Sequence, residues 1–276
     1  ELAKRFDGEI VSADSRQVYK GLDLGTGKVT EEEMEGVPHH MLDVVEPNQP
    51  YSVADFQAGA YAAIDDILAR GRTPFLVGGT GLYVRAVTEG FTFTDARPDP
   101  ALRAELEGKT TEELYALLRE KTGVTLTGGE ENNRHRLMRS VEKALSGRWE
   151  SPPPCPRYDC LLLGVTFPRE EVCRRIDARL QARIDAGMLD EVAELRANGA
   201  TDEFLEGLGL EYRYILRYLK GELSSLEELK DELGRAIKRF AKRQMVWFKK
   251  DRDVLWLDME GDFLTQAGRA VEGFLV

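Results

Sequence analysis

Cysteine is scarce in this chain of 276 residues, and the three that occur (Cys155, Cys160 and Cys173) are an odd number without close CxxC spacing. This usage argues against a disulfide framework and favours the reducing cytoplasm. No histidine lies beside Cys155 and Cys160 to complete a zinc site. Apolar runs of about 18 residues are also missing, so we expect no membrane-spanning helix and no membrane partner.

A complete phosphate-binding P-loop is missing as well, although Gly25-Thr26-Gly27-Lys28 resembles the end of one. The motif needs a glycine five positions before its second glycine, where Leu22 stands. It also needs Ser or Thr after the lysine, where Val29 stands. Histidine offers no metal site either: His39 and His40 are adjacent, and neighbouring residues of a strand point to opposite faces. We therefore interpret both histidines as structural.

Positive charge is in the minority, with a formal net charge of −11, and it is concentrated in a few segments. The strongest basic tract covers residues 235–252, and two others cover 134–148 and 169–183. Local basic tracts on an acidic protein can bind one shaped polyanion while the rest of the surface repels others. Solvated helix faces would give the same charge pattern, so both interpretations stay open.

The order of the elements indicates an α/β protein with an inserted helical segment. Strands are predicted at Glu9–Ala13, Met41–Val45 and Phe75–Val77, with a helix from Ser52 to Gly71 between the last two. Residues 93–157 carry helical signals only, at Ala101–Glu107, Glu112–Thr122 and Asn132–Leu145. A strand returns at Cys160–Thr166, and helices are expected to dominate from there to the end. The last long helix is expected to bury five apolar residues: Leu226, Leu229, Leu233, Ile237 and Phe240.

Two polar residues follow predicted strands at the sheet edge where α/β proteins collect their ligands. Asp14 comes directly after the first strand, and Thr80 follows Phe75–Val77 through Gly78-Gly79. Local sequence alone allows Asp14 to cap the following turn and Thr80 to cap the following helix. The local sequence therefore leaves both a catalytic role and a capping role possible for these two residues.

The motifs around these residues resemble the tRNA dimethylallyltransferases of bacterial type. The resemblance rests on D-S-x-Q-x-Y at 14–19, G-G-T-x-L-Y at 78–83 and the AKRQMVWF segment at 241–248. It implies a P-loop-NTPase-like parallel sheet core at 1–92 and 158–276, and a helical insertion at 93–157 that binds the anticodon stem of tRNA. It also implies a P-loop upstream of Glu1, so we expect the natural protein to have a further N-terminal piece before this residue.

The same resemblance implies transfer of a dimethylallyl group from its diphosphate to the N6 amine of the adenosine 3′ of the anticodon, in tRNAs reading codons that start with U. The implied catalytic residues are Asp14 as base, Thr80 and Arg179. Thr80, Arg175 and Arg179 are implied to bind the diphosphate. Arg179 is preferred over Arg175, which lies one helical turn earlier. Mg²⁺ is the implied cofactor, and the enzyme is expected to be a cytoplasmic monomer. The implied tRNA-binding residues are Asp14, Ser15, Arg16, Gln17, Arg103, Asn132, Asn133, Arg134, His135, Arg136, Lys242, Arg243 and Gln244.

Three other functions are compatible with parts of this pattern. An adenylate isopentenyltransferase would use the same chemistry on free AMP, ADP or ATP, but it needs neither a helical insertion nor a basic C-terminal helix. A small-molecule kinase is disfavoured by the D-S-x-Q-x-Y segment. A non-catalytic RNA-binding module is the third alternative. Two departures from the family pattern, at Glu130-Glu131 and at 207–213, affect the expected tRNA contacts.

Overall fold

The computed structural model describes the chain except for residues 94–98, 127–129, 148 and 150–151. It divides into two compact units, one formed by Glu1–Glu89 with Pro156–Val276 and the other by Gly90–Cys155. The first unit is called the core and the second the insertion. No helix in the described ranges is both long enough and apolar enough to cross a membrane.

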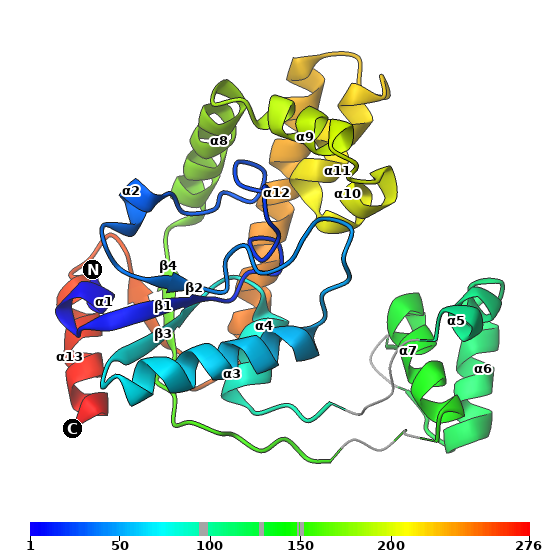
Figure 1. Ribbon diagram of the computed structural model, residues 1–276, viewed down its shortest axis with the longest axis horizontal. Coiled ribbons are helices and arrows are strands. Elements are labelled where there is room, and N and C mark those ends of the chain that lie inside the picture. The colour runs from blue at the N-terminus through cyan, green and yellow to red at the C-terminus, as the bar shows by residue number, and fades with distance from the viewer. Residues whose placement is uncertain (94–98, 127–129, 148, 150–151) are drawn as a thin grey trace. The chain divides into compact units, whose positions relative to one another are not determined.

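The first part of the core alternates strands and helices, and in its second part α8 to α12 follow one another between β4 and β5 (Figure 1). Its elements in chain order are α1 (Leu2–Arg5), β1 (Gly8–Ser12), α2 (Glu31–Met34), β2 (His39–His40), α3 (Val53–Ala69), β3 (Thr73–Val77), α4 (Gly81–Thr88), β4 (Leu163–Thr166), α8 (Arg169–Asp185), α9 (Met188–Ala197), α10 (Asp202–Leu208), α11 (Leu210–Leu219), α12 (Leu226–Phe248), β5 (Leu255–Asp258) and α13 (Phe263–Leu275).

The strands of the core pair in parallel. In the described part of the chain, β1 lies between β2 and β3, with Ser12 opposite Val77, and β4 pairs with β5. Parallel pairing sends β1 and β3 toward the same edge of the sheet, so the residues that follow Ser12 and Val77 come together there. The predicted α/β class with a parallel sheet is confirmed.

Two strand predictions need correction. The strand expected at Met41–Val45 lies instead at His39–His40, because Met41 and Asp43 have φ angles of 65° and 55°, which an extended strand cannot accommodate. Val45 retains a single parallel bridge to Tyr19. The second is β5, a strand that was not predicted, in a region where we expected helices to dominate.

The helix predicted between Ser52 and Gly71 is confirmed as α3. Ser52 accepts a hydrogen bond from the backbone N–H of Asp55, and the Asp55 carboxylate accepts one from the N–H of Ser52, which completes a capping box. Helix α3 packs on β1 and β3 (Figure 1). Its buried face forms part of what we call the sheet cluster, which comprises Val11, Ala13, Met41, Phe56, Ala60, Ile64, Ile67, Tyr83 and Val87.

A second apolar cluster, called the helical cluster, joins α8 to α12 and the loop after β1. Leu229 and Leu233 of α12 are buried in it as predicted, whereas Phe240 is 43% exposed, which corrects its expected burial. The other buried members are Val18, Tyr19, Leu22, Val45, Leu180, Met188, Val192, Ala200, Leu205, Leu208, Tyr212, Ile215, Leu216 and Leu223.

A buried carboxylate anchors the start of the sheet. Glu9 of β1 is 1% exposed; it forms ion pairs with Arg70 and Arg72 (2.9 Å) and a hydrogen bond with His40 (2.6 Å). The Arg70 guanidinium is the main reason why the pKa of Glu9 lies well below its ordinary value. Glu9 therefore remains charged and joins β1 to β2 and to the segment that leads into β3.

The insertion is a small helical unit with its own apolar centre. Its elements are α5 (Pro100–Glu107), α6 (Thr111–Thr122), the 3₁₀ turn η1 (Glu130–Asn132) and α7 (Arg134–Leu145). Its fully buried residues include Leu106, Leu114 and Leu137. The helices match those expected in this segment to within two residues at each end.

Candidate active site

Asp14 stands at the end of β1, half-buried, with its carboxylate turned onto the following turn. Its Oδ1 atom accepts hydrogen bonds from the backbone N–H groups of Arg16 (2.8 Å) and Gln17 (3.4 Å). This is the turn-capping geometry that the sequence allowed. No hydrogen-bond partner for Oδ2 occurs among the described residues. One carboxylate oxygen thus fixes the turn and the other is left for a ligand.

Thr80 lies beside this turn because β1 and β3 are neighbours. It stands at the N-cap position of α4, yet its side chain makes no capping bond to its own helix. Its Oγ1 instead accepts from the N–H of Ser15 (3.0 Å) and donates to the Ser15 hydroxyl (3.3 Å). The Thr80 hydroxyl is therefore held next to the residue that follows Asp14.

Arg179 reaches the same region from α8, more than 150 positions away in the sequence. Its Nη2 atom donates to the carbonyl of Gly27 at 3.0 Å, and the Gln17 side chain donates to the same carbonyl at 3.3 Å. Arg175, one helical turn earlier, pairs with Glu171 and lies 4.1 Å from the centre of the Phe167 ring. The structure thus brings Arg179, and not Arg175, to the loop that follows Asp14.

Arg16 presents a half-buried cation on the same turn. Burial is the main cause that lowers the pKa of its guanidinium. No hydrogen-bond acceptor for this guanidinium occurs in the described part of the chain, and the turn between α10 and α11 at Gly209 lies close to it. A buried guanidinium without an acceptor is suited to a ligand with phosphate or carbonyl oxygens.

The loop that contains the glycine-rich segment 25–28 already binds other groups of the protein. Lys28 has a side chain that is only 6% exposed, and it forms ion pairs with Asp23 and Asp43. The backbone N–H groups of Asp23, Leu24 and Gly25 all donate to the carboxylate of one residue of α9. These amides are therefore not available to a phosphate, in agreement with the missing P-loop motif.

The C-terminal end of α12 holds the loop that carries Thr80. The Gln244 side chain donates to the carbonyl of Gly79 at 3.0 Å. The Trp247 indole lies directly against Gly81, where a larger side chain would collide with it. The predicted tRNA-binding residue Gln244 thus supports the Thr80 loop, while Lys242 and Arg243 are exposed on the same helix.

Within the insertion, two predicted tRNA-binding arginines have internal partners. Arg103 donates to the buried carboxylate of Glu142 (2.9 and 3.2 Å), as does Arg139 (3.0 Å). Arg134 donates to the Glu107 carbonyl (2.7 Å) at the end of α5. Arg103 and Arg134 therefore hold the helices of the insertion together, and their contact with RNA stays a prediction.

The other predicted contacts of the insertion lie near the start of α7. Asn133 is its N-cap and accepts from the backbone N–H of Arg136 at 3.1 Å. The side chains of Asn132, His135 and Arg136 are exposed. This end of the helix thus presents polar groups and a cation at the surface of the insertion.

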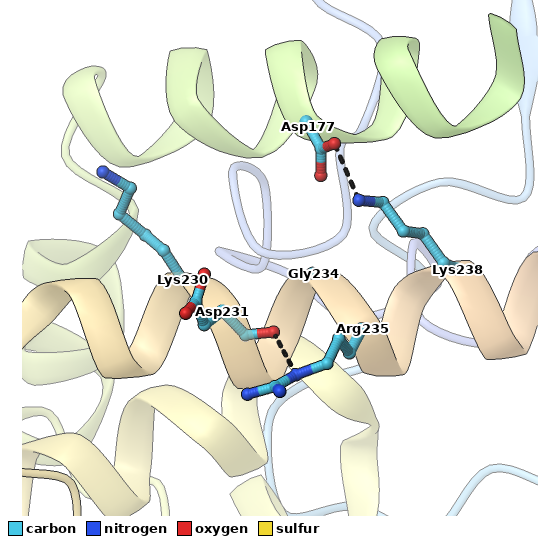
Figure 2. Close-up of a pocket in the computed structure, with 6 residues that line it drawn as sticks. All are labelled: Asp177, Lys230, Asp231, Gly234, Arg235 and Lys238. Carbon is cyan, nitrogen blue, oxygen red and sulfur yellow. Dashed lines mark hydrogen bonds and ion pairs between the residues drawn. The ribbon is translucent and has the colours of Figure 1, made fainter. Parts of the chain in front are cut away.

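A polar hollow of about 160 Å³ opens elsewhere on the core, between α8 and α12. Figure 2 shows Lys238 directed at Asp177 and Arg235 directed back at the carbonyl of Asp231. None of the residues that line it belongs to the group around Asp14. Because its charges are largely paired and it contains no predicted site residue, we do not assign the reaction to it.

No group of three or more His, Cys, Asp or Glu side chains in the described ranges is arranged to hold a metal ion. The three cysteines are free thiols. His40 bonds to Glu9 and His39 to the carbonyl of Val37 (2.8 Å). The described residues thus do not by themselves form a Mg²⁺ site.

Sequence reasoning missed the carboxylate that binds the loop amides, Glu191, and its neighbour Tyr212. Tyr212 is 2% exposed and donates its hydroxyl to Glu191 at 2.9 Å. Neither lies in a recognisable motif, and Glu191 is about 166 positions from its loop partners. A glutamate on an amphipathic helix carries no sequence signal for such a contact.

Comparison with known proteins agrees with the motifs. The family model described as IPP transferase matches residues 17–251. A protein of an Exiguobacterium species named tRNA dimethylallyltransferase is 41% identical over 94% of this chain and 85% of its own length. One from Shewanella sediminis, named tRNA dimethylallyltransferase 2, is 42% identical over 97% of this chain and 90% of its own length.

Solved structures give the same result. The tRNA isopentenylpyrophosphate transferase from Bacillus halodurans superimposes with a TM-score of 0.72 at 38% identity, covering 99% of this chain and 89% of that one. A eukaryotic dimethylallyltransferase, at 24% identity and a TM-score of 0.79, shares the fold. From the extent of these matches, this chain belongs to the IPP transferase family.

Proposed function

We propose that this protein transfers a dimethylallyl group from dimethylallyl diphosphate to the exocyclic N6 amine of the adenosine 3′ of the anticodon, in tRNAs reading codons that begin with U. Family membership and the names of the relatives support this activity. The observation that carries the proposal is the meeting of Asp14, Thr80 and Arg179, from three distant segments, around the turn that follows β1.

Asp14 acts as the general base. The amine nitrogen forms a bond to C1 of the dimethylallyl group, the bond from C1 to the diphosphate oxygen breaks, and its electron pair leaves with the diphosphate. The proton of the amine passes to Oδ2 of Asp14, because Oδ1 is engaged by the turn amides. An amine conjugated with a purine is a weak nucleophile, so an acceptor for its proton lowers the barrier.

Thr80 and Arg179 act on the departing diphosphate. A hydroxyl donor and a guanidinium stabilise the negative charge that develops on the leaving oxygen. Arg179 suits this task because it is exposed and makes one hydrogen bond in the described structure, to the Gly27 carbonyl. Its planar donors can bind two phosphate oxygens at once.

Mg²⁺ is proposed to accompany the diphosphate, whose oxygens would supply most of its ligands. The described residues do not form a cluster of ligands for it, so no step is assigned to the ion. The phosphate-binding loop that the family resemblance implies upstream of Glu1 stays a prediction. We propose a monomer that works in the cytoplasm, the compartment that the three unpaired cysteines favour.

The proposed tRNA contacts lie on both units. In the core, residues 14–17 face the target base and the exposed Lys242 and Arg243 face the RNA backbone. In the insertion, the exposed residues at the start of α7 contact the anticodon stem. Extrusion of an unstacked base into a pocket with hydrogen-bonding groups is the usual way in which a single RNA base is recognised.

The alternative function is prenylation of free AMP, ADP or ATP, which the chemistry at Asp14 would equally permit. The insertion and the basic α12 favour RNA, since a free nucleotide needs neither. The deciding assay offers AMP, ATP and an anticodon stem-loop with adenosine after the anticodon, each with dimethylallyl diphosphate. We expect product from the stem-loop. Product from the nucleotides alone would establish the adenylate enzyme instead.

A matched pair of variants tests the RNA surface. Exchange of Lys242 and Arg243 for alanine should raise the KM for the stem-loop, leave that for dimethylallyl diphosphate nearly unchanged and flatten the salt dependence of binding, because fewer counterions are released. Lys230→Ala removes a cation at the other end of α12, where it pairs with Glu227, and should change none of these. Equal effects of the two changes would contradict the proposed surface.

A further inference from the structure

Glu191 of α9 fills an anion-binding site made by the backbone of the loop that follows β1. Its Oε2 accepts from the N–H groups of Asp23 (3.0 Å) and Leu24 (2.6 Å), and its Oε1 accepts from that of Gly25 (2.9 Å). Successive N–H groups that converge in this way form a nest with a positive potential. The bound anion here is a side chain of the protein itself.

Tyr212 of α11 completes this site. Its hydroxyl donates to Oε1 of Glu191, so that the carboxylate accepts four hydrogen bonds. Burial raises the pKa of the Tyr212 phenol, which therefore stays protonated and a donor. The loop passes so close to the Tyr212 ring that a side chain at Gly25 would collide with it. The loop is thus fitted to α9 and α11.

The carbonyl side of the same loop is also held. The Arg183 guanidinium of α8 donates to the carbonyls of Leu24 and Gly25 and pairs with Glu211 (3.3 Å). The nearly buried ammonium of Lys28 closes the loop from within through its bond to the Tyr19 carbonyl (3.0 Å). Both faces of the peptide groups at 23–25 are therefore fixed by charged side chains.

This loop ends at the carbonyl that organises the site. The Gly27 oxygen accepts from Nη2 of Arg179 and from Nε2 of Gln17, and the backbone N–H of Gln17 donates to Asp14. A shift of the loop moves Gly27 and with it the acceptor that sets the direction of Arg179. A displacement of a catalytic group by about 1 Å can lower the reaction rate about 10²-fold.

We propose that Glu191 is a positioning residue for the reaction: by binding the amides of 23–25 it sets the Gly27 carbonyl, and thereby places Arg179 and Gln17 relative to Asp14. Glu191 makes no contact with the substrate in this scheme. The role in catalysis rests on the proposed function, whereas the coupling of Glu191 to Arg179 follows from the contacts of the loop.

The experiment compares Glu191→Gln with Glu194→Gln, an exposed glutamate on the same helix, in the full chain. An amide offers one acceptor oxygen and sets an NH₂ group against the loop N–H groups, so hydrogen exchange of the segment 22–28 should become faster in Glu191→Gln only. Affinity for inorganic diphosphate, which Arg179 is proposed to bind, should fall about tenfold. In turnover, kcat should fall about 10- to 100-fold with little change in the KM for the stem-loop.

A double variant separates positioning from general destabilisation. With Arg179→Ala already present, Glu191→Gln should lower kcat about twofold or less, because the diphosphate-binding side chain that it positions is gone and only the effect through Gln17 is left. An equal loss in both backgrounds, or faster loop exchange with unchanged diphosphate affinity, would overturn the proposal. If the unaltered protein prenylated no stem-loop, the proposed function would fail, and the exchange and diphosphate measurements would still decide whether Glu191 positions Arg179.

Discussion

Replacement of Arg179 by alanine should damage catalysis far more than folding. Arg179 is exposed, and among the described residues it makes one hydrogen bond, to the Gly27 carbonyl at 3.0 Å. Loss of such a bond costs about 1 kcal/mol or less in stability. A guanidinium bound to a leaving diphosphate contributes about 1.5–3 kcal/mol, because hydrogen bonds to charged groups are stronger than neutral ones. At about 1.4 kcal/mol per factor of ten, kcat/KM should fall roughly 10- to 150-fold.

Arg175→Ala is the matched control for this prediction, since it removes the same group one helical turn away. Arg175 is engaged by Glu171 and Phe167, so its loss should leave kcat/KM within about twofold. The assay is single-turnover transfer of radiolabelled dimethylallyl to the stem-loop, with stem-loop affinity measured separately and expected to be unchanged. A silent Arg179→Ala with a damaging Arg175→Ala would refute the assignment and move the diphosphate contact by one turn.

Three further predictions concern the turn, the α12 contact and the buried carboxylate. Asp14→Asn keeps an oxygen for the turn amides but cannot take a proton, so turnover should fall about 10²- to 10⁴-fold with an unchanged melting temperature; normal turnover would leave Asp14 a turn cap. Gly81→Ala drives a methyl group into the Trp247 indole and should cost about 1–3 kcal/mol in denaturant unfolding, whereas Gly207→Ala, in open space, should cost nothing. Glu9→Gln should cost roughly 2–3 kcal/mol of stability near pH 7, because it breaks a buried ion pair. The cost is not larger because the arginine partners are themselves half-solvated. The loss of stability should shrink below pH 4.5. The folded-state pKa of Glu9 is depressed, so its contribution is complete above its ordinary pKa of 4.5 and disappears as the pH falls; a difference in stability that is constant with pH would contradict this.

Local signals were sufficient where one segment determines its own structure. The capping box at Ser52 and the apolar periodicity after it predict α3 to within about two residues. They fail where distant groups decide. Met41 and Asp43 adopt positive φ angles that no residue type there demands, and the four-residue strand β5 is stabilised by pairing with β4, about 90 residues earlier.

The candidate site divides in the same way. Asp14 and Thr80 were identified because each follows a strand and lies in a motif, and parallel pairing then brings them together. Phe240 fits the apolar periodicity of α12, yet periodicity identifies a face of a helix and not what covers it. Glu191 was missed because its role as an acceptor depends on backbone amides of a loop that lies about 167 residues earlier in the sequence.

The two apolar clusters of the core share one site between them, and this has a consequence for thermal inactivation. Asp14 and Thr80 depend on the sheet cluster, whereas Arg179 precedes Leu180, which is buried in the helical cluster. Helix α12 contributes to the helical cluster and reaches the Thr80 loop through Gln244. Parts of a folded chain unfold as cooperative units, and these units differ in stability. Whichever cluster opens first removes half of the site, so the temperature at which turnover is lost should report the weaker cluster, while the melting of total helix content reports both.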